Sequence, residues 1–72
     1  MTNVKFITGV TFPDIKPIKK GTMVKVFKSQ YDDEYLLSYK DETLCSLIEA
    51  VNEGYIKQTK SLNKYLPKDF HI

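Results

Sequence analysis

Hydrophobic and polar residues alternate along the first half of the chain with the period of β-strands. Apolar side chains or threonine occupy every second position from Val4 to Phe12, the pattern of a strand with one buried face. Two further runs, Met23 to Lys28 and Glu34 to Lys40, predict a second and a third strand. Residues 13–22 contain proline and glycine and predict a loop. Since consecutive strands usually lie side by side, we expect these three to pair as antiparallel neighbours.

The next segment changes to the period of an α-helix. Asp41 offers a side-chain acceptor to free backbone N–H groups, so we predict it as the N-cap. The apolar residues that follow have helical spacing and are Leu44, Leu47, Ile48 and Val51. Gly54 suits the left-handed position just past a helix end. The sequence therefore predicts a helix over residues 41–53.

Beyond this helix, residues 55–59 predict a fourth strand, and Ser61 is a candidate cap for a short helical turn before Pro67. The predicted order is β-β-β-α-β followed by that turn. We therefore expect a single α+β domain over residues 1–72, with one amphipathic helix packed on a small, mainly antiparallel sheet. An SH3-like barrel is the alternative, because residues 19–27 and 33–40 also suit a strongly bent hairpin.

The length of the chain and its few cysteine and histidine residues limit how the fold can be stabilised. Seventy-two residues, 42% of them hydrophobic, indicate one globular domain with a small core. Cys45 is the only cysteine and His71 the only histidine, so neither an internal disulfide nor a nitrogen–sulfur metal site can form. Association of two copies is the remaining way to stabilise so small a fold, so we expect a homodimer. A lone cysteine and the lack of a long apolar run or leader predict a cytoplasmic protein without a membrane span.

Charged residues are sorted into three blocks along the chain. Residues 1–30 contain six lysines and one acid, residues 31–53 seven acids and one lysine, and residues 54–72 four lysines and one acid. The formal net charge of +2 hides this separation. Surfaces of opposite sign steer and select partners, so the pattern points to binding rather than to a reaction.

The acidic block predicts a surface for a positively charged partner. On the predicted helix, Glu42, Glu49 and Glu53 fall on one face, opposite the apolar stripe. Glu49 and Glu53 repel each other, so the sequence tolerates a small local cost to keep this face anionic. The predicted partner-binding residues are Asp32, Asp33, Glu34, Glu42, Glu49 and Glu53. A solvated outer face without a role is the competing interpretation.

Lysine-rich segments leave a second function open, a small nucleic-acid-binding domain. Its candidate residues are Lys16, Lys19, Lys20, Lys25 and Lys28. These side chains could contact phosphates, but all eleven basic residues are lysine, so the arginine fork that reads guanine is absent. Cys45 and His71 are the only candidate nucleophile and base, and their ordinary roles are a small apolar side chain and a solvated terminal residue. We expect no enzymatic activity, no cofactor and no metal.

In its length, its lone cysteine, its lack of arginine and segments such as KFITGV, SLIEAVNEGYIK and SLNKYL, the chain resembles the short host-takeover proteins of staphylococcal and related phages. The resemblance implies a dimeric inhibitor that binds a host protein directly in the cytoplasm of the bacterium. Sliding-clamp inhibitors of this group suggest the partner, the ring-shaped clamp of the DNA polymerase. Such an inhibitor would block the basic DNA channel and prevent clamp loading, so that host DNA replication stops.

A clamp also has an outer groove, which takes peptides with Gln and, three residues later, Leu. Here Asp33 follows Gln30 at that distance, and Ser61 follows Gln58. We therefore expect obstruction of the channel rather than docking in the outer groove.

Overall fold

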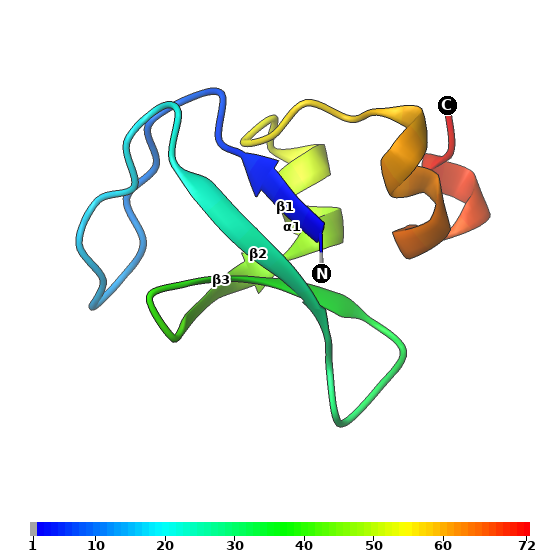
Figure 1. Cartoon of the computed structure of the whole chain (residues 1–72), viewed down its shortest axis with the longest axis horizontal. Helices are drawn as coiled ribbons and strands as arrows, with labels where there is room; N and C mark the ends of the chain where they lie inside the picture. The colour runs from blue at the N-terminus through cyan, green and yellow to red at the C-terminus, as the bar shows by residue number, and fades with distance from the viewer. Residues whose placement is uncertain (1) are drawn as a thin grey trace.

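Four antiparallel strands form a meander with one short helix against it. The structure is a computed structural model and describes residues 2–72. Strands β1 (Thr2–Lys5), β2 (Met23–Lys28), β3 (Tyr35–Tyr39) and β4 (Glu42–Ser46) lie in that order, each antiparallel to the next. Helix α1 (Leu47–Asn52) follows, then two 3₁₀ segments, η1 (Lys60–Tyr65) and η2 (Lys68–Phe70) (Figure 1). The expected α+β class is confirmed, and over residues 2–72 the sheet does not close into a barrel.

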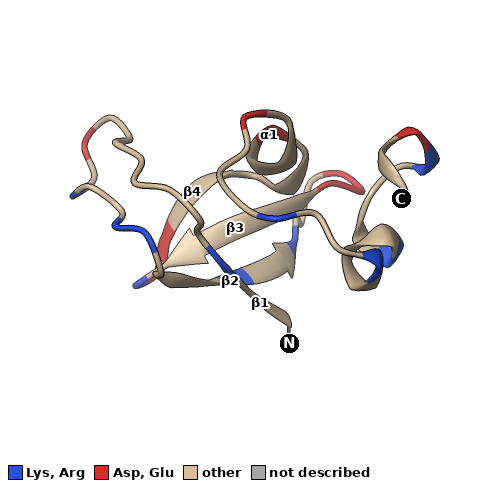
Figure 2. Ribbon diagram, turned by 90° about the horizontal axis from the view of Figure 1, so that it is seen from above, with Lys and Arg blue, Asp and Glu red and all other residues tan. Residues whose placement is uncertain are grey.

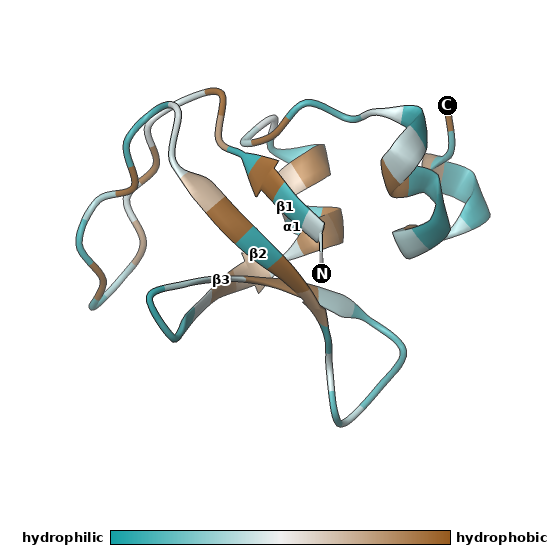
Figure 3. Cartoon of the chain, in the orientation of Figure 1, coloured by the Kyte–Doolittle hydropathy of each residue, from teal (hydrophilic) through white to brown (hydrophobic). Residues whose placement is uncertain are grey.

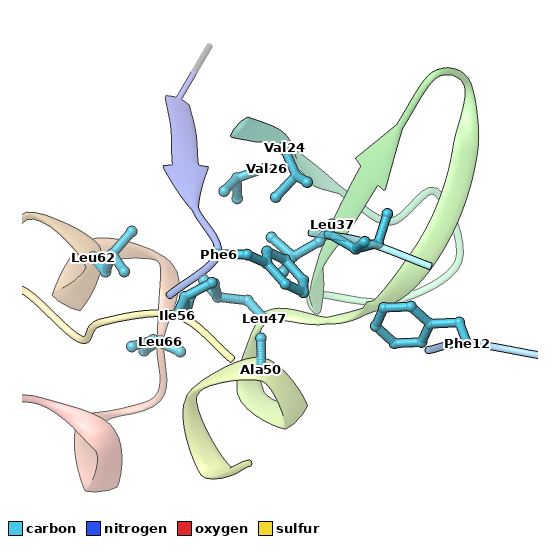
Figure 4. Close-up of a cluster of buried hydrophobic side chains, with 11 residues drawn as sticks. Phe6, Phe12, Val24, Val26, Leu37, Leu47, Ala50, Ile56, Leu62 and Leu66 are labelled. Carbon is cyan, nitrogen blue, oxygen red and sulfur yellow. The ribbon is translucent and has the colours of Figure 1, made fainter. Parts of the chain in front are cut away.

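The buried side chains come from distant parts of the chain and meet between the sheet and α1. Phe6, Leu37 and Leu47 have no exposed surface. The other members of the cluster are Phe12, Ile18, Val24, Val26, Ala50, Ile56, Leu62 and Leu66 (Figure 4). The elements that supply them carry much of the hydrophobic colour in Figure 3, whereas the turn between β2 and β3 is hydrophilic. No polar or charged side chain of the described chain is buried, so burial of apolar surface is what stabilises the fold.

The first predicted strand is shorter than its alternating pattern. The pattern predicts a strand from Val4 to Phe12, but β1 ends at Lys5. The prediction is wrong beyond that residue, because the chain bends at Ile7 and Thr8. Beyond the bend only Val10 makes a bridge, to Ile18 across a long loop. The alternation nevertheless marked core positions at Phe6 and Phe12, which are buried, whereas Thr8 in the same pattern is exposed.

The predicted helix over residues 41–53 is wrong in its first half, where the chain forms β4. Lys40 and Asp41 have φ angles of 50° and 67°, and they form the two-residue turn of the β3–β4 hairpin. The helix begins after Ser46, whose hydroxyl oxygen accepts the Glu49 N–H at 3.0 Å. Ser46 is therefore the N-cap that had been expected at Asp41. Pairing of β4 with β3 satisfies backbone groups and overrides the helical spacing of the apolar residues.

The C-terminal third contains less regular structure than predicted. Gly54 has a φ of 75° just past α1, as expected. Residues 55–59 are not a strand, because only Ile56 pairs, in an isolated bridge with Phe6. The short final helical turn is present as η1, which begins after Thr59 rather than at Ser61. The order is thus four strands, one helix and two 3₁₀ segments, in place of the predicted β-β-β-α-β.

Candidate partner-binding groove

A groove of about 570 Å³ lies between the β2–β3 turn, the start of α1 and the end of η1. Its rim carries the acids of the turn, and its floor is apolar and aromatic. We call it the acidic groove and define it by Asp32, Asp33, Glu34, Tyr35, Ile48 and Tyr65. One cation, Lys64, also lines it, with its ammonium nitrogen 5.2 Å from the centre of the Tyr65 ring, so the three carboxylates leave the groove with a net negative lining. Cavities of 300–1,000 Å³ with apolar walls and a few polar groups are typical of ligand sites.

The acidic rim is a turn ordered by its own hydrogen bonds. An oxygen of the Asp32 carboxylate accepts the Glu34 N–H at 2.9 Å, and the Ser29 N–H donates to the Glu34 carbonyl oxygen at 2.9 Å. These bonds hold three consecutive carboxylates at one end of the sheet. Lys28 Nζ lies 3.7 Å from Asp33 Oδ1, but both side chains are well exposed, so this pair contributes little to stability.

The floor of the groove contains a preformed aromatic pair. The rings of Tyr35 and Tyr65 meet edge to face with their centroids 4.9 Å apart. The Tyr65 hydroxyl is hydrogen-bonded to the Thr2 hydroxyl at 2.5 Å, and this bond lowers the pKa of the Tyr65 phenol. Ile48 and the buried Leu47 add the apolar wall on the helix side. The floor of the groove therefore offers an apolar and aromatic surface, and its rim offers negative charge.

The remaining predicted acids lie in two other places. Glu49 and Glu53 are exposed on and just after α1, the helix that forms a wall of the acidic groove. Figure 2 shows acidic residues on this helix and, separately, on the turn between β2 and β3. Glu42 is on β4 and lines a different cavity, together with Lys16 and Lys40. The prediction that Glu42 shares a helix face with Glu49 and Glu53 is therefore wrong, because Glu42 belongs to a strand.

The five candidate nucleic-acid-binding lysines are spread over several elements. Lys16, Lys19 and Lys20 belong to the long loop between β1 and β2, and all three are exposed. Lys25 points outward from the middle of β2, whereas Lys28 ends that strand beside Asp33. The acid next to Lys28 weakens the attraction of this end of β2 for a polyanion.

Cys45 and His71 have structural surroundings that do not activate them. Burial, and then the negative charge of Glu49, raise the pKa of the Cys45 thiol to about 11, so the thiol stays protonated at neutral pH. A ring nitrogen of His71 is within 2.9 Å of the Leu66 carbonyl oxygen. Across residues 2–72, no three metal-ligating side chains come together, and none of the helices is long and apolar enough to cross a membrane.

Sequence reasoning missed the floor of the acidic groove. It assigned Ile48 to a core stripe and did not identify Tyr65 as part of any site. Ile48 on α1 and Tyr65 on η1 meet Tyr35 of β3 only through tertiary packing, which no local pattern indicates. The one available signal was the abundance of tyrosine, five residues in 72.

Comparison of the chain with models of known protein families, with curated proteins and with solved structures gives no match.

Proposed function

We propose that this protein is an inhibitor that binds a positively charged surface of another protein through the acidic groove. The observation that carries the proposal is the coincidence of three carboxylates of one hydrogen-bonded turn with a half-buried aromatic floor in one cavity. A charged rim gives orientation and a fast encounter, and an apolar centre gives most of the affinity. Coverage of the partner's basic surface would then exclude the partner's own ligand.

The partner we propose is the bacterial sliding clamp, as the resemblance to phage host-takeover proteins implies. The DNA channel of a clamp is basic, so a ligand that occupies it must present negative charge. The rim of the acidic groove would supply that charge, and Glu49 and Glu53, exposed on and just after α1, would add to it. Two copies of this small chain would obstruct the channel better than one, and the homodimer is part of the proposal.

Binding of the full chain to a purified staphylococcal clamp tests this proposal. Asp33→Lys and Glu49→Lys each reverse one exposed charge at or beside the groove. We expect each variant to bind at least about tenfold more weakly, the equivalent of 1.4 kcal/mol. Glu42→Lys is the matched control, since it makes the same change in net charge away from the groove and should bind like the unmodified protein.

Clamp loading onto primed DNA provides the second measurement. The unmodified protein should prevent loading, and the Asp33→Lys variant should do so less well. Equal binding by all three variants would refute the role of the acidic groove. A different outcome is that the protein fails to bind the clamp but retards a DNA duplex in a gel, with weaker binding at higher salt. That result would replace the proposed clamp inhibition with the alternative nucleic-acid-binding function.

A further inference from the structure

The edge of β1 presents unpaired backbone groups to solvent. β1 is the first strand of the sheet, and only its inner side pairs with β2. The Phe6 N–H donates to the Thr22 carbonyl oxygen at 2.9 Å, on the β2 side, whereas the Ile7 N–H donates to the Tyr55 carbonyl oxygen at 2.8 Å, on the other side. Because backbone groups alternate along a strand, the N–H groups of Asn3 and Lys5 face the same outer side as that of Ile7. No loop of the described chain pairs with them.

A second groove runs along this edge. It has a volume of about 390 Å³ and lies between β1 and the segment over residues 57–62. We call it the strand-edge groove and define it by Val4, Lys5, Ile7, Met23, Lys57 and Leu62. Ile7 and Met23 are 45% and 50% exposed, which is high for large apolar side chains. Exposed backbone groups beside exposed apolar side chains are the features by which an open sheet edge accepts another strand.

The charge of the strand-edge groove is positive throughout. Lys5 and Lys57 line it, and no acidic side chain does. We propose that this groove binds an extended, acidic segment of a partner protein, which adds to the sheet as a strand next to β1. The segment would exchange backbone hydrogen bonds with Asn3 and receive one from the Lys5 N–H, while its carboxylates reach Lys5 and Lys57.

A second copy of the chain fits this edge less well. Antiparallel pairing of β1 with its own copy would bring four lysines, Lys5 and Lys57 of each chain, to one seam. Like charges across neighbouring strands are destabilising. An acidic segment neutralises these lysines instead, so charge complementarity favours a partner of opposite sign.

The test is a titration of the isotope-labelled full chain with a short capped peptide that alternates glutamate and valine, followed by amide resonances. A peptide with lysine in place of glutamate is the control ligand. We expect the glutamate peptide to shift the amides of Asn3 and Lys5 and of residues 57–62, but not those of the acidic groove. Binding therefore reports on this site independently of the proposed clamp inhibition.

Two variants separate backbone from side-chain effects at one position. Asn3→Pro removes the outward N–H, and proline is tolerated on edge strands where this group faces solvent. Asn3→Ala removes the same side chain but keeps the N–H. We expect Asn3→Pro to weaken peptide binding at least about tenfold and Asn3→Ala by no more than about twofold.

Charge reversal supplies a third variant that does not depend on a proline. Lys57→Glu should weaken binding of the glutamate peptide, whereas Lys16→Glu, an exposed lysine in the β1–β2 loop, should not. The proposal is overturned by absence of glutamate-peptide binding, by equal binding of the lysine peptide, or by equal affinity of Lys57→Glu and Lys16→Glu. A dimer that Asn3→Pro dissociates would also overturn it, because the occupant would then be a second copy.

Discussion

Ser46 and Asp41 give the sharpest test of where the helix begins. In the structure the Ser46 hydroxyl caps α1 by accepting the Glu49 N–H at 3.0 Å. Replacement of an N-cap serine by alanine costs about 1 kcal/mol, within a range of 0.5–2 kcal/mol. A change of 1 kcal/mol lowers the melting temperature of a domain of this size by about 4–8 °C. We therefore expect Ser46→Ala to melt several degrees below the unmodified protein.

Asp41→Gly should act in the opposite direction. Asp41 has a φ of 67° in the β3–β4 turn, a left-handed conformation that costs a residue with a side chain roughly 1 kcal/mol relative to glycine. Glycine also adds entropy to the unfolded chain, which offsets part of that gain. The expected net effect is a stabilisation of roughly 0.5 kcal/mol. If Asp41 were an N-cap, the same substitution would instead lower stability.

Thermal and urea unfolding, followed by circular dichroism, measure both effects. The slope of free energy against urea should stay unchanged, because neither substitution alters the surface exposed on unfolding. Ser46→Asp is the control, since aspartate caps helices as well as serine does. A neutral Ser46→Ala together with a destabilising Asp41→Gly would refute the β4 assignment and restore a helix that begins near residue 41.

Two further predictions concern Cys45 and Tyr65. Because the pKa of the Cys45 thiol is raised to about 11, this thiol should react with iodoacetamide at pH 8 at least about tenfold more slowly than in the urea-unfolded chain. The difference in rate should shrink as the pH approaches 11. Equal rates at pH 8 would contradict the burial of Cys45. Tyr65→Phe removes the hydrogen bond to Thr2 and keeps the ring contact with Tyr35, so the free energy of unfolding should fall by about 0.5–1.5 kcal/mol. Thr2→Val should cause no further loss in that variant, and a fully additive double variant would show that the two hydroxyls do not interact.

Local patterns were sufficient for part of the fold. Residues 23–26 alternate between exposed and buried positions, and β2 has the predicted bounds. Gly54 ends α1 as expected, because a positive φ is cheapest for glycine. At both places the controlling interaction lies within a few residues of sequence, so the sequence reveals it.

Interactions between residues far apart in sequence determine the parts of the fold that local patterns do not predict. Residues 42–46 carry apolar side chains at positions that suit either a helix or a strand, and pairing with β3 selected the strand. The turn that makes this pairing possible is Lys40-Asp41, which lacks the glycine that usually marks such a hairpin. The acidic groove was predictable only on its rim, since three acids are adjacent in sequence, while Tyr35, Ile48 and Tyr65 meet through tertiary packing.

Tyr65 connects the acidic groove to β1. Its ring meets Tyr35 in the acidic groove, and its hydroxyl holds Thr2, at the start of the strand that borders the other groove. A ligand that rotates this phenol in one groove must also loosen or re-anchor β1. Thermodynamic reciprocity requires that any such change in affinity at one groove be matched by the same factor at the other, whereas a ligand that leaves the phenol in place, as we expect of the glutamate–valine peptide, produces no coupling. The hydrogen bond between Tyr65 and Thr2 would then be the contact through which the two grooves influence each other.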